Sequence, residues 1–426
     1  MVIAFARALL GVAFFCLAAW LLSSHRRRFP WRVVVGGIGM QAVLAALLLA
    51  TAGGQSLFRW GAGFADKLIS MAEPGAQFAF GPLADPAAMG EVFGPSGAFV
   101  FAFAGKGLVA ILFFSALMGV LYHIGVMQLF VWCFARVMSL FLGVSGAESM
   151  AVAANVFVGQ TEAPLVVRPY LDKMTSSELN ALMTGGFATI AGSVLAVYMG
   201  ILGPEIGPHL LTASVMSAPA AFLIAKIMQP ETEVPETAGR VELRIDRTAD
   251  NVIDAAARGT TEGLSLWLNV IAMLIAFMGL VGLFDWFLDS ISGNSVITAE
   301  LSLRQIFGWV FAPVAWMMGV EGWHDCQLFG SLLGTKISVN EFVAFGDMQT
   351  YMNPASELVF QSERTAKMAA YALCGFANFA SIGIQIGGIG ALAPERRGDL
   401  SRLAVRAMLG GAFASWMTAT MAGAFL

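Results

Sequence analysis

Long apolar runs dominate the chain, and many of them approach the roughly 20 residues that a helix needs to cross a bilayer. Between 53 and 104 the pattern is mixed, with many Gly, Pro and Phe residues, and it predicts an interfacial segment. The other apolar runs predict transmembrane spans at 2–23, 33–52, 106–141, 179–203, 207–228, 263–288, 364–393 and 403–426. The expected fold class is therefore an all-α polytopic membrane protein with about eight transmembrane helices.

Two further stretches contain apolar pieces that are each too short to cross and that polar residues interrupt. Residues 143–174 and 301–335 are predicted to be re-entrant helical hairpins, because non-helical backbone at membrane depth must be surrounded by protein. Glu162 lies within the first hairpin, and Asn340 and Glu341 follow the second. Counting the crossings places the two hairpins on opposite sides of the membrane, which is typical of inverted repeats in secondary transporters.

Charge sets the expected orientation. Residues 26–32 hold four arginines directly after the first apolar run, and the positive-inside rule places this loop in the cytoplasm and the N-terminus outside. Residues 229–259 are charged and polar, and they predict a cytoplasmic linker with an amphipathic helix at its end. Charged residues make up only 12% of the chain, far fewer than in a soluble domain, and no feature suggests nucleic-acid binding.

Polar side chains inside apolar segments are the candidate functional residues. An ionised carboxylate at membrane depth is costly unless it faces water, a partner or a ligand, which favours a functional role for Glu162 and Glu341. Asn378 and Ser381 lie three residues apart and are expected to share a helix face, either for a ligand or for hydrogen bonding between helices. Lys336 either neutralises a carboxylate or extends its ammonium group to the interface.

Asn155 and Thr189 are isolated oxygen-bearing residues in apolar stretches. Hard cations prefer oxygen ligands, often carbonyls that a helix break leaves unpaired. Structural hydrogen bonding is the alternative role for both residues.

Two other classes of protein fit the pattern less well than a secondary transporter. A passive channel requires a continuous polar lining, whereas the polar residues here concentrate in the interrupted segments. An enzyme requires a catalytic constellation, and the chain has neither a G-x-S-x-G nor an H-E-x-x-H motif.

Three motifs carry a resemblance to a known family. The stretches "GQTEAPL" (159–165), "GTKISVNEFVAF" (334–345) and "CGFANFASIG" (374–383) resemble the signatures of the concentrative nucleoside transporters, and the similarity covers nearly the whole chain. The resemblance implies a nucleoside importer of a bacterial inner membrane that works by cation symport. Sodium is the expected coupling ion and the proton is the alternative. Uridine-like pyrimidine nucleosides are the expected substrates, with purine nucleosides left open.

The resemblance also implies a homotrimer in the lipid bilayer and a division into two domains. A scaffold domain would comprise residues 1–141 and 260–300. A transport domain would comprise residues 142–228 and 301–426 and would move as an elevator, with 229–259 as the linker.

Site residues follow from motif position within this resemblance. The nucleobase would be contacted by Gly159, Gln160, Thr161, Glu162 and Val194. The ribose hydroxyls would be held by Glu341, Asn378 and Ser381, with Phe376 nearby. Sodium would be bound by the side chains of Asn155 and Thr189 and by the carbonyls of Val158 and Ile190. No residue is expected to be catalytic.

Overall fold

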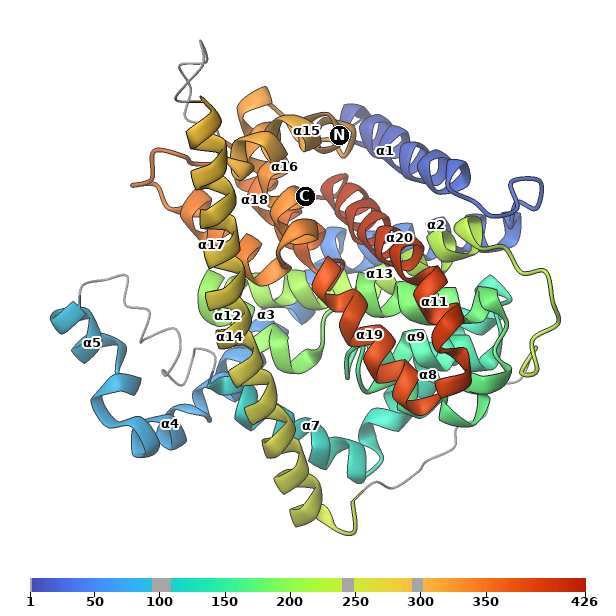
Figure 1. Ribbon diagram of the computed structural model, residues 1–426, viewed down its shortest axis with the longest axis horizontal. Coiled ribbons are helices and arrows are strands. Elements are labelled where there is room, and N and C mark those ends of the chain that lie inside the picture. The colour runs from blue at the N-terminus through green and yellow to red at the C-terminus, as the bar shows by residue number, and fades with distance from the viewer. Residues whose placement is uncertain (1, 94–108, 240–248, 293–301) are drawn as a thin grey trace.

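The fold is built from helices throughout the part of the chain that the structure describes (Figure 1). This structure is a computed structural model, and it describes residues 2–93, 109–239, 249–292 and 302–426. Every regular element within these ranges is a helix, which confirms the predicted all-α fold class. The count of eight spans and the inverted repeats stay predictions.

Four described helices are long and apolar enough to cross a membrane by themselves. They coincide with the first, second, fifth and sixth predicted spans. The first is α1 (Val2–Leu21), and the second is α2 (Trp31–Ala45) with a π-helical extension at Ala46–Ala50. The others are α13 (Gly207–Met228) and α14 (Val252–Ser292). Helix α14 starts before its predicted span because the polar end of the predicted linker continues the same helix.

The predicted single helix over 106–141 is wrong. Residues from 109 onward form two helices, α7 (Ala110–His123) and α8 (Val126–Leu142), which are bent by 76°. Gly125 lies between them with φ of +90°, a conformation that glycine adopts without steric cost. The Tyr122 carbonyl accepts from the Gln128 side chain at 2.5 Å and from the Gly125 N–H at 3.1 Å, so both residues after the first helix hold the bend.

Two other predicted spans, at 179–203 and 364–393, are not continuous helices, because each is interrupted by non-helical backbone, and that each segment crosses the membrane stays a prediction. The first break covers 189–191 and the second covers 374–378. The glycines of the second segment, Gly383, Gly387, Gly388 and Gly390, lie within the regular helix that follows the break. The four pieces are α11 (Ser176–Ala188), α12 (Gly192–Leu202), α18 (Glu363–Leu373) and α19 (Phe379–Leu392).

The two segments predicted as hairpins differ from one another in form. The first begins with α9 (Gly146–Asn155), and after an irregular loop its second arm is only the short α10 (Ala163–Val166) followed by a 3-10 turn. The second is a pair of helices, α15 (Leu303–Met317) and α16 (Trp323–Ser338), joined by a short turn. Its second helix therefore ends three residues later than predicted. That either segment is re-entrant stays a prediction.

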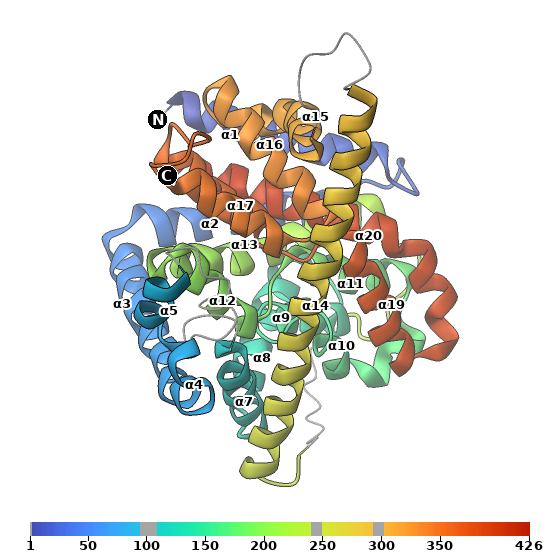
Figure 2. The ribbon, with the colours of Figure 1, turned by 60° about the vertical axis from the view of Figure 1, so that its left-hand side comes forward.

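The remaining helices complete the bundle. The described part of the predicted interfacial segment forms α3 (Ala52–Ser70), α4 (Glu73–Phe80) and α5 (Pro86–Phe93). Helix α17 (Glu341–Met352) follows the second helix pair, and α20 (Arg397–Gly423) matches the last predicted span. Helix α13 is almost entirely buried and packs against α20, which is mostly buried after its first third, whereas α14 runs along the outside of the molecule (Figure 2).

The two helix breaks cross at Gly375. This residue has φ of +140°, and a Cβ atom there would lie 2.8 Å from the Phe187 carbonyl oxygen and 2.9 Å from the Ala188 carbonyl oxygen. The chain after α18 therefore lies directly on the backbone at the end of α11. This close approach fixes where the two interrupted helices meet.

We expect Gly375→Ala to destabilise the folded protein by about 1–3 kcal/mol, because it adds backbone strain and a steric clash with buried backbone. Thermal unfolding in detergent, followed by size-exclusion chromatography, measures this loss. The matched control is Gly383→Ala within α19, where a Cβ atom would have no neighbour within 4 Å. Equal thermal stability of the two variants would contradict the crossing at Gly375.

Candidate functional site

Four interruptions of helices meet in one region. They are the loop after α9 (156–162), the two breaks at 189–191 and 374–378, and the junction between α16 and α17 (339–340). The Gly192 N–H donates to the Phe157 carbonyl at 3.0 Å, which joins the loop to the first break. The second break is joined to the α16–α17 junction by Asn378, whose Nδ2 donates to Glu341 at 2.9 Å. The region therefore combines residues from both halves of the chain.

Glu341 is the buried carboxylate of this region. It lies in the first turn of α17 and is 6% exposed. Its Oε1 accepts a hydrogen bond from the Tyr198 hydroxyl at 3.0 Å, and its Oε2 accepts from Asn378. Asn340 caps α17 by accepting from the Val343 N–H at 2.9 Å. A carboxylate at a helix N-terminus is stabilised by the helix dipole, so the position suits a charged acceptor.

Asn378 and Ser381 meet for a different reason than predicted. Asn378 is not inside a helix, because its φ of −141° and ψ of 164° are extended and it caps α19. Its Oδ1 accepts from the Ser381 N–H at 2.8 Å. The prediction that the two residues share a helix face is therefore wrong, and the capping hydrogen bond holds them together instead.

Gln160 connects the first motif to the third. Its Nε2 donates to the Ser381 hydroxyl at 3.3 Å, and its Oε1 accepts from Gln385 Nε2 at 3.0 Å. The preceding residue, Gly159, has φ of +95°, and a Cβ atom there would lie 2.7 Å from the Ala191 Cβ. Glycine is required at this position because both the backbone conformation and the packing exclude a side chain.

The remaining predicted substrate residues surround this group less directly. Val194 is buried and Phe376 is half-buried, and both pack in the apolar core. Thr161 is exposed and Glu162 is half-buried. Among the described contacts, neither of these two side chains bonds to Glu341 or Asn378. The structure thus brings Gln160, Glu341, Asn378 and Ser381 together and leaves Thr161 and Glu162 outside their hydrogen-bond network.

Two members of the network were missed from the sequence. Tyr198 is fully buried in α12 and donates to Glu341, and Gln385 is 1% exposed in α19 and donates to Gln160. Each is a polar side chain within an apolar helix, which is the available sequence signal. Their partners lie 143 and 225 residues away along the chain, so the signal does not identify them.

The burial of Lys336 excludes one of its two predicted roles, the interfacial one. The side chain is fully buried and does not reach an interface. Its Nζ donates to the Ala372 carbonyl at 2.8 Å and to the Ser415 hydroxyl at 2.9 Å. Ala372 lies in the last turn of α18, where carbonyls lack partners within the helix. Lys336 therefore stabilises the end of α18 directly before the second break.

Asn155 and Thr189 fit a cation site. Asn155 is 1% exposed at the end of α9, and its Oδ1 has no hydrogen-bond partner among the described residues. Thr189 caps the C-terminal end of α11 and is also 1% exposed, with its hydroxyl donating to the Gly185 carbonyl at 3.0 Å. A buried acceptor without a donor, beside two helix C-termini, suits a hard cation.

The cation candidates adjoin the Gln160 group. A Cβ atom at Gly186 would lie 3.4 Å from Asn155 Oδ1, 3.0 Å from Gln160 Cβ and 2.7 Å from Gln385 Nε2. All three side chains therefore converge on the same turn of α11. The carbonyls of Val158 and Ile190 belong to the adjoining loop and break.

Comparison with known families gives three consecutive matches. Residues 10–83 match the N-terminal part of the Na+ dependent nucleoside transporters, and residues 209–423 match their C-terminal part. Residues 106–205 match a nucleoside recognition domain termed Gate.

Individual relatives agree with these matches. An uncharacterized transporter of Haemophilus influenzae is 43% identical over 98% of this chain and 97% of its own length. Sodium/nucleoside cotransporter 1 of Rattus norvegicus is 38% identical over 97% of this chain and 62% of its own length.

Solved structures share the whole fold. CNTnw in an inward-facing substrate-bound state is 42% identical, covers 99% of both chains and superposes with a TM-score of 0.90. A variant of CNTnw in an outward-facing state is 41% identical, covers 99% of this chain and 98% of its own, and gives a TM-score of 0.92. The chain belongs to the family of the Na+ dependent, concentrative nucleoside transporters, and its resemblance to that family is confirmed.

Proposed function

We propose that this chain imports nucleosides, with uridine-like pyrimidine nucleosides as substrates, by symport with sodium. The observation that carries the proposal is the buried Glu341 carboxylate, held by Tyr198 and Asn378 beside the Gln160 and Ser381 pair. A nucleoside is uncharged and rich in donors and acceptors, so it requires a buried site with matched hydrogen bonds. The family membership gives the substrate class, and the site supplies matching groups.

The two parts of a nucleoside need different groups, and the network offers both. Glu341 would accept from the ribose hydroxyls, with Asn378 and Ser381 as further partners and Phe376 against the sugar face. The Gln160 amide offers both a donor and an acceptor to the edge of the base. Gly159, Thr161, Glu162 and Val194 would complete the base side.

Sodium is the favoured coupling ion on chemical grounds. We assign it to the side chains of Asn155 and Thr189 with the carbonyls of Val158 and Ile190. Neither side chain titrates in the physiological range, so this group of oxygens suits a metal cation and not a proton. Proton coupling is the alternative and would require a carboxyl group such as Glu162 or Glu341.

The chain would work as a homotrimer with an elevator motion. Residues 1–141 and 260–300 would form the scaffold, and residues 142–228 and 301–426 would carry the site across the membrane, with 229–259 as the linker. One observation supports a shared interface: none of the described side chains in the apolar window of α14 is buried within a single chain. Subunit contacts or lipid cover such a surface. The proposed location is the bacterial inner membrane, with the N-terminus outside.

We expect Glu341→Gln to weaken uridine binding by about 2–4 kcal/mol, because a charge-assisted hydrogen bond to a ribose hydroxyl becomes a neutral one in a buried site. Isothermal titration with purified protein measures the affinity. The matched control is Glu363→Gln, which removes a carboxylate that is 83% exposed in an ion pair with Lys367. Wild-type affinity of a folded Glu341→Gln protein would reject the ribose role.

Sodium coupling predicts that sodium tightens uridine binding and that uridine tightens sodium binding by the same factor. In Asn155→Ala, the sodium concentration for half-maximal uridine uptake should rise at least about tenfold, because one of few ligands is lost. Uptake into proteoliposomes, with sodium and proton gradients imposed separately, measures this.

Position 189 supplies an isosteric control for the same assay. Thr189→Val removes the hydroxyl at nearly constant volume and should act like Asn155→Ala. Thr189→Ser keeps the hydroxyl and should leave the sodium dependence unchanged. Uptake that ignores sodium and follows an imposed pH gradient would establish proton coupling instead, and uptake that never exceeds equilibration would establish a passive channel.

A further inference from the structure

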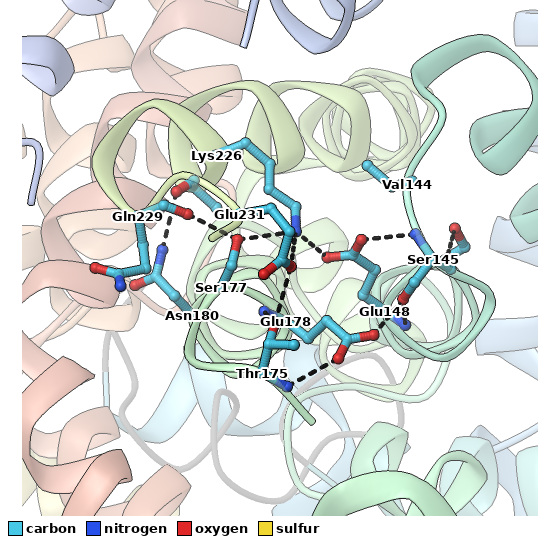
Figure 3. Close-up of polar contacts among 12 residues, drawn as sticks. Val144, Ser145, Glu148, Thr175, Ser177, Glu178, Asn180, Lys226, Gln229 and Glu231 are labelled. Atoms are coloured by element: carbon cyan, nitrogen blue, oxygen red, sulfur yellow. Dashed lines mark hydrogen bonds and ion pairs between the residues drawn. The ribbon is translucent and has the colours of Figure 1, made fainter. Parts of the chain in front are cut away.

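A second buried polar region lies at the opposite ends of α9 and α11 from the candidate site (Figure 3). It surrounds an ammonium group in the last turn of α13. We call this region the Lys226 cluster, and it comprises six residues: Ser145, Glu148, Thr175, Glu178, Lys226 and Glu231. The network described above uses none of them.

In this cluster, the N-terminal caps of α9 and α11 are joined to each other. Ser145 caps α9 and its N–H donates to Glu148 at 2.7 Å, while Thr175 caps α11 and its N–H donates to Glu178 at 2.9 Å. The Ser145 hydroxyl also donates to Glu178 across the two helices at 2.5 Å. The caps therefore hold the two helix starts side by side.

Lys226 supplies the positive charge for this junction. Its Nζ lies 2.7 Å from Glu148 Oε2 and 3.5 Å from Glu231 Oε2, and it donates to the Ser177 hydroxyl at 2.9 Å. The Lys226 and Glu148 side chains are 5% and 1% exposed. A buried carboxylate that loses its cation is strongly destabilised, so the geometry of both helix starts depends on Lys226.

The segment after α13 closes the cluster from outside. Glu231 accepts from the Thr175 hydroxyl at 2.9 Å. Thr237 binds the start of α9 twice, because its hydroxyl accepts from the Ala147 N–H at 2.9 Å and its carbonyl accepts from the Gly146 N–H at 3.0 Å. Three helices and this segment are thus fixed together at one end.

The other ends of the same two helices carry the proposed sodium ligands. Helix α9 has 10 residues and α11 has 13, so the cluster lies on the order of 15–20 Å from Asn155 and Thr189. At the end of α9, Asn155 Nδ2 donates to the Leu182 carbonyl of α11 at 3.5 Å. A Cβ atom at Gly186, three residues before Thr189, would lie 3.4 Å from Asn155 Oδ1, so axial slip of α9 against α11 would move Asn155 relative to the end of α11 that carries Thr189.

We propose that Lys226 is a positioning residue for the sodium site: it fixes the axial register of α9 against α11, and this register brings Asn155 next to Thr189. The role rests on the sodium coupling proposed above. It does not involve contact with the ion or with the nucleoside. It predicts that losing Lys226 weakens sodium binding selectively.

The test is sodium-dependent uridine uptake by full-length protein in proteoliposomes. Lys226→Met should raise the half-saturating sodium concentration about five- to tenfold, at the lower end of effects seen for groups that orient metal ligands. The KM for uridine at saturating sodium should stay within about twofold of wild type, since the nucleoside contacts are unchanged. Lys226→Arg should recover part of the sodium affinity.

Two further variants show whether the charge balance is the cause. In Glu148→Gln/Lys226→Met the most buried carboxylate is removed together with its nearest cation, so Glu148 is not left charged and unpaired, and most of the shift should disappear. Lys173→Met is the matched control, because Lys173 forms an exposed ion pair with Glu236 at 3.1 Å, and it should behave as wild type. Should Lys226→Met not fold, Glu231→Gln replaces it, with an expected rise of about two- to threefold for one weakened buried contact.

The outcomes separate this role from the sodium coupling itself. Wild-type uptake that does not respond to sodium overturns both. A sodium-dependent wild type, with an unshifted half-saturating concentration in folded Lys226→Met or Glu231→Gln, overturns the role of Lys226 alone. An equal rise in the KM for uridine at saturating sodium also overturns it, because a general structural defect would have that effect.

Discussion

Backbone N–H and C=O groups at the ends of interrupted helices must find partners within the protein, because the bilayer core supplies no water. Here the interruptions satisfy one another. The Gly192 N–H, directly after the first break, donates to the Phe157 carbonyl in the loop after α9. The Lys336 ammonium group donates to the Ala372 carbonyl at the end of α18. The side chains of Asn340 and Asn378 cap the helices that resume after the α16–α17 junction and after the second break. The candidate site is the place where these requirements coincide.

This constraint explains why polar side chains are concentrated in so small a region of an apolar molecule. The second break and the α16–α17 junction each have an asparagine cap, and at the second break this cap, Asn378, is also one of the groups proposed to bind the nucleoside. Asn378 illustrates the overlap, since one end of its amide caps α19 while the other end binds Glu341. A substitution at such a residue would therefore alter the helix geometry and the proposed ligand contacts together.

Much of this arrangement follows from the sequence. Hydropathy alone predicts the all-helical fold, and the costly carboxylate at Glu341 and the motif around Gln160 predict where the site lies. The breaks after α11 and α18 are invisible to the same reasoning, because residues such as Ile190 and Ala377 are as apolar as the helices beside them. A bend that depends on one glycine, Gly125, is equally hidden within an apolar run. The partners of Tyr198 and Gln385 depend on contacts between distant segments, which no local pattern contains.

The sequence separation of the site contacts has a consequence for how the protein is made. Gln160 bonds to Ser381, which lies 221 residues later, and ribosomes add about 5–20 residues per second. The first half therefore waits on the order of 10–40 s in or near the membrane before its partners are synthesised. The caps around Lys226 need no such delay, because every residue of that cluster lies between Ser145 and Glu231. Helices α9, α11 and α13 can thus assemble early. The polar groups near Gln160 must instead make their hydrogen bonds to water or to the insertion machinery until translation is nearly complete.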